Sequence, residues 1–289
     1  MQIDEQRLKL TAQVRALLQR SLFWLNVFKC LKAITLPSWL SLVLSAVVDT
    51  SIYFLSAGKL NSSPRPLGDS TIYATEYDTF YFIRGGTDDL YNVLPHREDD
   101  VHDFIVSALK KGDVFIDVGA NIGYYTVLGA KKVGAKGLVL AIEPVLQTMN
   151  ILKTNIRLNR LSNVHVIGKA AWRTRERLQL SVPKELYGGA SLVKHCGNKL
   201  IAVDGVPIDE VCADVSNIKL MKLDVEGAEY EVLQGSNDSL LRTQLLVTEV
   251  SRDAEDILDI LKDRGFECRK CKFSTYILCK NTVFGRALP

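Results

Sequence analysis

The sequence predicts an α/β protein with a doubly wound, mostly parallel sheet, preceded by a helical N-terminal extension. Three observations lead to this fold class: short apolar strands alternate with helices from residue 114 onward, a glycine-bearing turn follows the first of these strands, and the first 60 residues are rich in leucine at helical spacing. Such alternation places parallel strands side by side, with helices on both faces of the sheet.

The N-terminal extension is predicted to be helical over residues 1 to about 60. Leu10, Val14 and Leu17 recur at helical spacing, with Arg15 and Arg20 on the other side. Between residues 33 and 58 the only charged side chain is Asp49. Such a tract is long enough to span a bilayer, which needs about 20 apolar residues.

Several features favour a soluble helix pair over a membrane span. Pro37 breaks the tract early, and Asp49 would cost a few kcal/mol in hydrocarbon. Four hydroxyl residues dilute its hydropathy, namely Ser41, Ser45, Thr50 and Ser51. The prediction is two helices packed on the following domain, with membrane association through residues 23–58 as the alternative.

The domain boundary is predicted after a turn-rich linker at residues 61–68. The extension and linker then cover residues 1–68, and the α/β domain covers residues 69–289. Two paired strands, 70–75 and 79–84, are expected at the start of this domain, followed by a helix beginning near Asp100.

The α/β core is expected to follow a regular order. The predicted strands are 114–118, 138–143, 164–168, 220–224 and 245–250. The predicted helices are 122–132, 145–159 and 254–264, and a final hairpin pairs 266–270 with 275–280. Residues 172–217 form a variable stretch that the pattern does not resolve.

The turn after the first core strand indicates nucleotide binding. Gly119 and Gly123 remove the Cβ atoms that would keep the backbone away from a ligand at the strand end. The helix that follows directs its free N–H groups at that ligand. Glu143 ends the next strand, where an acid can accept hydrogen bonds from both ribose hydroxyls.

The loop chemistry favours S-adenosylmethionine over a dinucleotide. A diphosphate favours G-x-G-x-x-G, and the middle glycine is missing between Gly119 and Gly123. Asp117 would repel a diphosphate but suits the amino group and sulfonium of S-adenosylmethionine. A nicotinamide-dependent dehydrogenase and a turn without a ligand are the less favoured alternatives.

A second group of acids follows the strand at 220–224, in the run from Asp224 to Glu229 (Asp-Val-Glu-Gly-Ala-Glu). Together with the loop, this run resembles the FkbM family of S-adenosylmethionine-dependent methyltransferases. The resemblance covers about residues 80 to 267 and includes Phe115 to Thr126, Glu143-Pro144, Asn155, Asn159, Ala170-Ala171 and Glu249. One departure is Pro207-Ile208-Asp209, where the family often carries Thr-Leu-Asp. The implied fold is a seven-stranded, Rossmann-like methyltransferase sheet with an antiparallel edge strand.

The resemblance and the strand positions together give each candidate residue a role. The cofactor is expected to contact Asp117, Gly119, Asn121, Gly123, Glu143, Ala170, Ala171 and Asp224. Asp117 would face the amino end, Glu143 the ribose, and the two alanines the adenine. Asp224 is expected nearest the methyl group, and Glu226 is the candidate catalytic base. Arg84, Asp88 and Glu249 are the candidate contacts to the acceptor.

The predicted reaction is methyl transfer to a hydroxyl of a glycan, lipid or secondary metabolite. The acceptor is therefore a small molecule or glycan. A net charge of +3 and the lack of a basic, aromatic-rich stripe argue against nucleic acid. An RNA methyltransferase and a non-catalytic cofactor-binding protein remain the alternatives.

The six cysteines are expected to be reduced thiols in a cytoplasmic protein, with a membrane-associated protein as the alternative, because the N-terminus lacks a cleavable signal pattern. Cys268 and Cys271 have the spacing of half a zinc site, with Cys279 as a third ligand. A plain β-hairpin is the favoured interpretation, so no metal is predicted.

Overall fold

The computed structural model describes residues 2–60, 63–94, 97–183, 189–193, 199–272 and 274–284, with side chains described from residue 10. The chain divides into two compact units, Met1–Arg97 and Glu98–Pro289. The sequence placed the boundary between residues 68 and 69 instead. The difference arises because the first strand after the linker pairs with the strand between the N-terminal helices, and the second strand pairs with the first, which ties both to the first unit.

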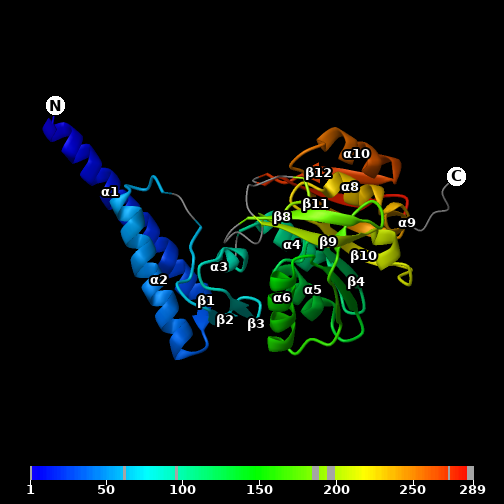
Figure 1. Ribbon diagram of the computed structural model, residues 1–289, viewed down its shortest axis with the longest axis horizontal. Helices are drawn as coiled ribbons and strands as arrows, with labels where there is room; N and C mark the ends of the chain where they lie inside the picture. Colours follow the sequence, from blue (N-terminus) through cyan, green and yellow to red (C-terminus); the bar gives the residue numbers. More distant parts are fainter. Residues whose placement is uncertain are drawn as a thin grey trace. The chain divides into compact units, whose positions relative to one another are not determined.

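The first unit combines a helix pair with a small antiparallel sheet (Figure 1). Its elements are α1 (Gln2–Cys30), β1 (Leu31–Ala33), α2 (Leu36–Leu55), β2 (Ser70–Ala74), β3 (Thr79–Ile83) and α3 (Asp89–Asn92). The strand order is β1-β2-β3. The predicted helices are thus present, and β1 is an addition that periodicity alone did not reveal. Their packing on the second unit stays a prediction.

The second unit is built on a seven-stranded sheet of order β12-β13-β11-β10-β4-β5-β6. These strands are β4 (Val114–Val118), β5 (Leu138–Ile142), β6 (Val164–Ile167), β10 (Ile218–Leu223), β11 (Thr243–Glu249), β12 (Phe266–Lys270) and β13 (Tyr276–Asn281). The pairs from β11 through β6 are parallel, and β13 is antiparallel to both of its neighbours. The predicted doubly wound, Rossmann-like methyltransferase sheet is confirmed.

Helices cover both faces of this sheet, with α5 and α6 on one side and α8 and α10 on the other (Figure 1). The helices of the unit are α4 (Asp99–Ala108), α5 (Tyr124–Val133), α6 (Leu146–Leu158), α8 (Glu229–Gln234), α9 (Asn237–Leu241) and α10 (Ala254–Asp263). The sheet is buried on both faces, which agrees with strands that are continuous apolar runs, such as Leu138–Ile142, rather than alternating ones.

A second, three-stranded sheet of order β7-β9-β8 begins just before the variable stretch and continues within it. It consists of β7 (Ala170–Ala171), β8 (Arg177–Val182) and β9 (Lys199–Val206), and α7 (Ile208–Val211) follows it. The Asp209 carboxylate, which follows the departure at Pro207, accepts the N–H groups of Asp238 (3.1 Å) and Ser239 (2.7 Å) at the start of α9. Asp209 is therefore a structural cap.

The expectation of reduced cysteines is wrong for one pair. Cys268 and Cys279 oppose each other on the antiparallel strands β12 and β13, with a Cα–Cα distance of 4.1 Å, and form a disulfide. A thiolate zinc site made of Cys268, Cys271 and Cys279 is incompatible with this bond. Cys271 is a buried free thiol.

Candidate cofactor-binding site

The site begins where the carboxyl ends of β4 and β10 meet. Gly119 follows β4 with a φ of 77°, and a Cβ atom added there would lie 1.8 Å from the carbonyl oxygen of Asp224. The glycine was expected to make room for a ligand. Its nearest neighbour is instead the backbone of the adjacent strand end, so Gly119 first serves to bring the two strand ends together.

The loop after Gly119 is held from the side of α6. Gly123 starts α5 with a φ of 94°, and a Cβ there would lie 2.5 Å from Cδ1 of Leu152. Nδ2 of the fully buried Asn155 donates to the carbonyl oxygen of Ile122 over 2.8 Å. The loop conformation is therefore fixed by packing within the protein.

Glu143 bridges this loop and the start of α6. Its Oε2 accepts the N–H of Asn121 over 3.0 Å, and its Oε1 accepts the N–H of Val145 over 2.9 Å. Each carboxylate oxygen can accept a second hydrogen bond. The backbone therefore orients Glu143 while leaving acceptor capacity for hydroxyl donors.

A cavity of about 520 Å³, measured with the open space at its mouth, lies over these strand ends. Its lining includes most of the predicted site: Gly119, Asn121, Glu143, Ala170, Ala171, Asp224 and Glu226. Ile142, Pro144, Leu180, Ala190, Leu192 and Val225 complete it. Asp117 and Gly123 are not among the lining residues. Leu180, Ala190 and Leu192 were missed because they come from the variable stretch, where no motif marked them.

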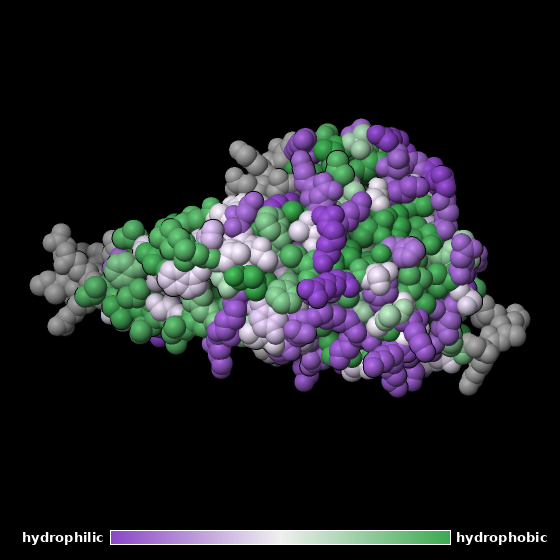
Figure 2. Space-filling view, turned by 90° about the horizontal axis from the view of Figure 1, so that it is seen from below, coloured by the Kyte–Doolittle hydropathy of each residue, from purple (hydrophilic) through white to green (hydrophobic). Residues whose placement is uncertain are grey.

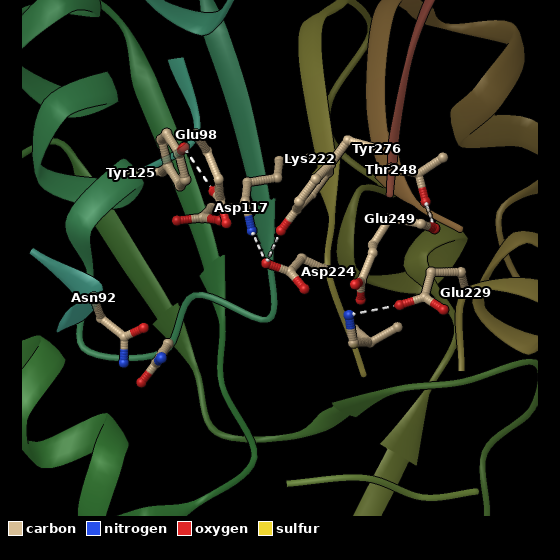
Figure 3. Close-up of polar contacts among 12 residues, drawn as sticks. Asn92, Glu98, Asp117, Tyr125, Lys222, Asp224, Glu229, Thr248, Glu249 and Tyr276 are labelled. Carbon is tan, nitrogen blue, oxygen red and sulfur yellow. Dashed lines mark hydrogen bonds and ion pairs between the residues drawn. The ribbon is translucent and has the colours of Figure 1, made fainter. Parts of the chain in front are cut away.

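Asp224 is part of a buried polar network (Figure 3). Its Oδ2 accepts hydrogen bonds from Nζ of Lys222 (2.9 Å) and from the hydroxyl of Tyr276 (2.7 Å). Lys222 lies opposite Asp117 in the register of β10 and β4. One lysine therefore lies between the two acids that the sequence placed at this sheet edge.

The charges in this network oppose one another. Burial raises the pKa of Asp117, and the nearby Lys222 opposes that shift. Burial would lower the pKa of Lys222, but Asp224 and Asp117 outweigh it and raise that pKa. Lys222 is therefore a cation that offsets one of the acids, and the field is less negative than the acids alone would produce.

Two buried acceptor atoms lack a partner in the described part of the chain, and one of them belongs to a residue of the cavity lining, Asn121. Oδ1 of Asp117 and Oδ1 of Asn121 have no hydrogen-bond partner among the described residues. Buried polar atoms are normally paired, so such exceptions point to a missing partner. The hydroxyl and amino groups of a nucleoside cofactor are suitable donors for this edge of the sheet.

A sequence profile of the methyltransferase FkbM domain matches residues 117–268, more than half of the chain. The chain belongs to the FkbM methyltransferase family. The family predicted from the loop and the Asp224 to Glu229 run is thereby confirmed, and so is its cofactor, S-adenosylmethionine.

Two curated relatives of this FkbM protein are methyltransferases. Methyltransferase sdnD of Sordaria araneosa is 27% identical over 203 residues, which cover 57% of this chain and 78% of the relative. Methyltransferase 1 of Beauveria bassiana is 28% identical over 173 residues, covering 52% of this chain and 64% of the relative.

Two solved structures are similar to this chain at low sequence identity. A SAM-dependent O-methyltransferase from Thermotoga maritima has a TM-score of 0.45 at 14% identity and covers 76% of this chain and 79% of its own. Aeropyrum pernix fibrillarin, in complex with natively bound S-adenosyl-L-methionine, has a TM-score of 0.41 at 12% identity and covers 74% and 94%, respectively.

The acidic run of this FkbM domain contains two acids that line the cavity, Asp224 and Glu226, and one that does not, Glu229. Glu226 (φ 55°) and Gly227 (φ 99°) form a tight turn in the left-handed region. Oε1 of Glu229 accepts the N–H groups of Val225 (3.0 Å) and Gly227 (3.2 Å), which fixes that turn. Burial is the main cause of the raised pKa of Glu229. Glu229 is therefore a positioning residue, a role that its place after a glycine turn could have indicated.

The predicted acceptor contacts are not brought into the cavity lining. Arg84 donates to Asp89 through Nε (2.8 Å) and Nη2 (2.7 Å) within the first unit, and Asp88 precedes α3 in the same unit. Glu249 ends β11, accepts from the Thr275 hydroxyl over 2.9 Å, and points toward the loop after Asp224 (Figure 3). Their contact with an acceptor stays a prediction.

Metal binding finds no support in the part of the chain that the structure describes. No group of three or more histidine, cysteine, aspartate or glutamate side chains there could hold an ion.

Proposed function

We propose that this FkbM protein transfers a methyl group from S-adenosylmethionine to a hydroxyl of a small-molecule or glycan acceptor, with lipid hydroxyls included in that class. The observation that carries the proposal is the shared cavity of Glu143, Asp224 and Glu226, floored by Gly119. It combines acceptors for a nucleoside with a carboxylate at the position where an acceptor would enter.

The residues of the cavity divide the work of holding the cofactor. Glu143 accepts the ribose hydroxyls. The backbone N–H groups of Asn121 and Val145 hold its two carboxylate oxygens in place for this contact. Ala170 and Ala171 leave space for the adenine. Asp224 is held by Lys222 and Tyr276 at the methyl-bearing end. When bound, S-adenosylmethionine supplies an electrophilic methyl group on a cationic sulfur.

Alignment and proton removal are the two catalytic tasks left to the protein. Holding the acceptor oxygen in line with the methyl group lowers the barrier by several kcal/mol, because the acceptor loses its translational and rotational freedom on binding and not in the chemical step. A neutral hydroxyl is a weak nucleophile, so a positioned base that takes its proton adds a factor of about 10²–10⁴. We assign that base to Glu226, which lines the cavity on the turn that Glu229 fixes.

Cofactor titration tests the first half of the proposal. Calorimetry with S-adenosylmethionine, its demethylated product and NAD is expected to show binding of the first two. Glu143→Gln should raise the Kd for S-adenosylmethionine about tenfold, since hydrogen bonds to charged groups contribute about 1.5–3 kcal/mol. The exposed Glu255 provides the matched control, Glu255→Gln, with no change expected. Binding of NAD alone would overturn the assignment.

Methyl transfer tests the second half. The protein is incubated with methyl-labelled cofactor and fractionated extract, and the labelled product is identified by mass spectrometry. Glu226→Gln is expected to keep cofactor affinity but to lower turnover by at least a hundredfold. Label in RNA would replace the proposal by the RNA methyltransferase. Cofactor binding without methyl transfer to any fraction would replace it by the non-catalytic protein.

A cytoplasmic location remains a prediction, and the disulfide between Cys268 and Cys279 is the feature that tests it. Disulfides are rare in reducing compartments. Alkylation of Cys268 and Cys279 in protein taken directly from cells, detected as a mass shift, would show that the two thiols are reduced there. That result would support a cytoplasmic location.

A further inference from the structure

The outer face of α2 is apolar and exposed. The helix has 20 residues, is long and apolar enough to cross a membrane by length and composition, and has 17% of its apolar window buried. Its side chains that are at least 40% exposed are Leu36, Trp39, Leu40, Leu44, Val47, Val48, Ile52 and Leu55. We call this set the α2 face. Contiguous apolar surface of this kind marks an interaction site.

A second apolar stripe runs along α1. Its members are 39–63% exposed and, apart from the adjacent Leu17 and Leu18, follow at intervals of three or four residues: Leu10, Val14, Leu17, Leu18, Leu22 and Leu25. We call this set the α1 stripe. Figure 2 shows hydrophobic residues gathered on the surface of this unit. Both α1 and α2 therefore carry apolar surface that the rest of their own unit does not cover.

Asp49, the only acidic residue between residues 10 and 60, is neutralised inside the unit. Oδ2 and Oδ1 of Asp49 accept from Nε (2.5 Å) and Nη2 (2.8 Å) of Arg20, and Nε1 of Trp24 donates to Oδ2 over 2.7 Å. The pair joins α1 to α2 and is largely buried. The cost expected for placing Asp49 near hydrocarbon is thus reduced, because the charge is paired within the protein.

The opposite side of α2 is covered by polar backbone. The side-chain oxygens of Ser38, Ser41 and Ser45 accept the N–H groups of Thr71 (2.9 Å), Gly68 (3.0 Å) and Leu67 (2.8 Å), respectively. Lipid therefore cannot surround the first half of this helix. This arrangement favours a helix lying in the plane of a membrane surface over one that crosses it.

Cations outnumber acids along this part of the chain. Between residues 10 and 60, Asp49 is the only acidic residue, whereas Arg15, Lys29, Lys32 and Lys59 are exposed cations. Anionic lipid headgroups complement such cations, each contributing about 1 kcal/mol near the surface. A second copy of the chain, paired through the same surface, would bring like charges together instead.

We propose that the N-terminal unit docks on the surface of an anionic lipid bilayer, with the α2 face and the α1 stripe in the interface and without crossing it. The proposal is independent of the methyl acceptor, because it depends on residues of the first unit alone. It gives the extension a function that the FkbM domain match, at residues 117–268, does not cover.

Vesicle flotation of the full chain tests the proposal. Binding is expected to vesicles with 30% phosphatidylserine in phosphatidylcholine, to be weaker with phosphatidylcholine alone, and to fall as salt rises. The variant Leu44→Glu with Val48→Glu should lose at least tenfold in partitioning. The matched control, Gln19→Glu with Asn26→Glu, adds the same charge at exposed polar positions of α1 and should lose much less.

Tryptophan quenching reports contact with the acyl chains. Trp39 is 52% exposed, whereas Trp24 and Trp172 are 3% and 8% exposed. Brominated lipids in the anionic vesicles are therefore expected to quench wild-type fluorescence, and Trp39→Phe should abolish that quenching. Absence of vesicle binding by the wild type would overturn the proposal. A concentration-dependent dimer in sedimentation, lost in the α2 variant without any flotation, would assign the surface to a second copy.

Discussion

The hydroxyl of Tyr276 lies 2.7 Å from Oδ2 of Asp224, although 52 residues separate them in the chain. Tyr276 starts β13, the antiparallel strand of the sheet, and Asp224 follows β10, two strands away in the sheet order. The same carboxylate oxygen accepts Nζ of Lys222. The C-terminal hairpin thus holds the acid assigned to the methyl-bearing end of the cofactor.

Removing the hydroxyl of Tyr276 should weaken cofactor binding. A hydrogen bond to a charged group contributes about 1.5–3 kcal/mol, so Tyr276→Phe is expected to raise the Kd for S-adenosylmethionine about tenfold. Calorimetric titration measures the change. Tyr73→Phe is the matched control, because that phenol also donates to an aspartate, Asp78 over 3.1 Å, in the first unit. Equal affinities for the wild type and Tyr276→Phe would show that Asp224 needs no such support.

Lys222 should be the most costly single loss in the network. Its side chain is 3% exposed, and Lys222→Met leaves the buried Asp117 and the partly buried Asp224 without their cation. Breaking a buried pair costs about 3–5 kcal/mol, and we expect a loss of that size in the free energy of unfolding by urea. Asp117→Asn removes one of the acids, so the double variant should recover part of the loss. Strict additivity of the two substitutions would contradict the proposed compensation.

The sheet of the second unit could be predicted because every strand and helix carries its own signal. Strands such as Val114–Val118 end at a glycine turn, and the alternation of strands with helices predicts that the strands run parallel. The strand β9 and the short β1 were missed for the opposite reason. The strands β1 and β9 depend on partners in other parts of the chain and show no regular alternation. The strand β8 does alternate polar and apolar residues and is followed by Pro183, so its signal was present and was overlooked.

The acids of the candidate site were predicted, but the cation that offsets them was not. Glu143, Asp224 and Glu226 lie at or just after the carboxyl ends of strands. In a parallel sheet these ends meet at one edge, so the three acids lie close together. Lys222 lies inside an apolar strand, and nothing in its neighbours signalled that it faces Asp117. The contribution of Tyr276 depends on how the terminal hairpin joins the sheet, which the order of residues does not specify.

Gly119 provides a test that separates strain from collision. Gly119→Ala places a Cβ 1.8 Å from the carbonyl oxygen of Asp224, so the strand ends must move apart. Gly112 has a φ of 90° with nothing within 4 Å of an added Cβ, and Gly112→Ala is therefore the control for strain alone. We expect a loss of about 1–2 kcal/mol for the control. The loss for Gly119→Ala, measured by urea denaturation, should be clearly larger and accompanied by loss of cofactor binding. Similar losses for both variants would show that the loop accommodates a side chain.

The pH dependence of stability should report the buried Glu229. Burial raises its pKa in the folded protein above the ordinary value of 4.5, so the folded state binds this proton more tightly than the unfolded chain. The resulting stabilisation is complete below pH 4.5 and is lost as pH rises through the folded value. Glu229→Gln keeps an oxygen for the N–H groups of Val225 and Gly227 but cannot titrate.

The free energy of unfolding of the wild type, relative to Glu229→Gln, should therefore fall as pH is raised from 4 to 8, when both are measured by urea denaturation. Glu229→Ala leaves the two N–H groups without their acceptor and should lose about 1–3 kcal/mol at every pH. Because the turn carries Glu226, that variant should also lose methyl transfer, whereas Glu229→Gln should keep it. A pH-independent difference between the wild type and Glu229→Gln would mean that Glu229 titrates alike in the folded and unfolded chain.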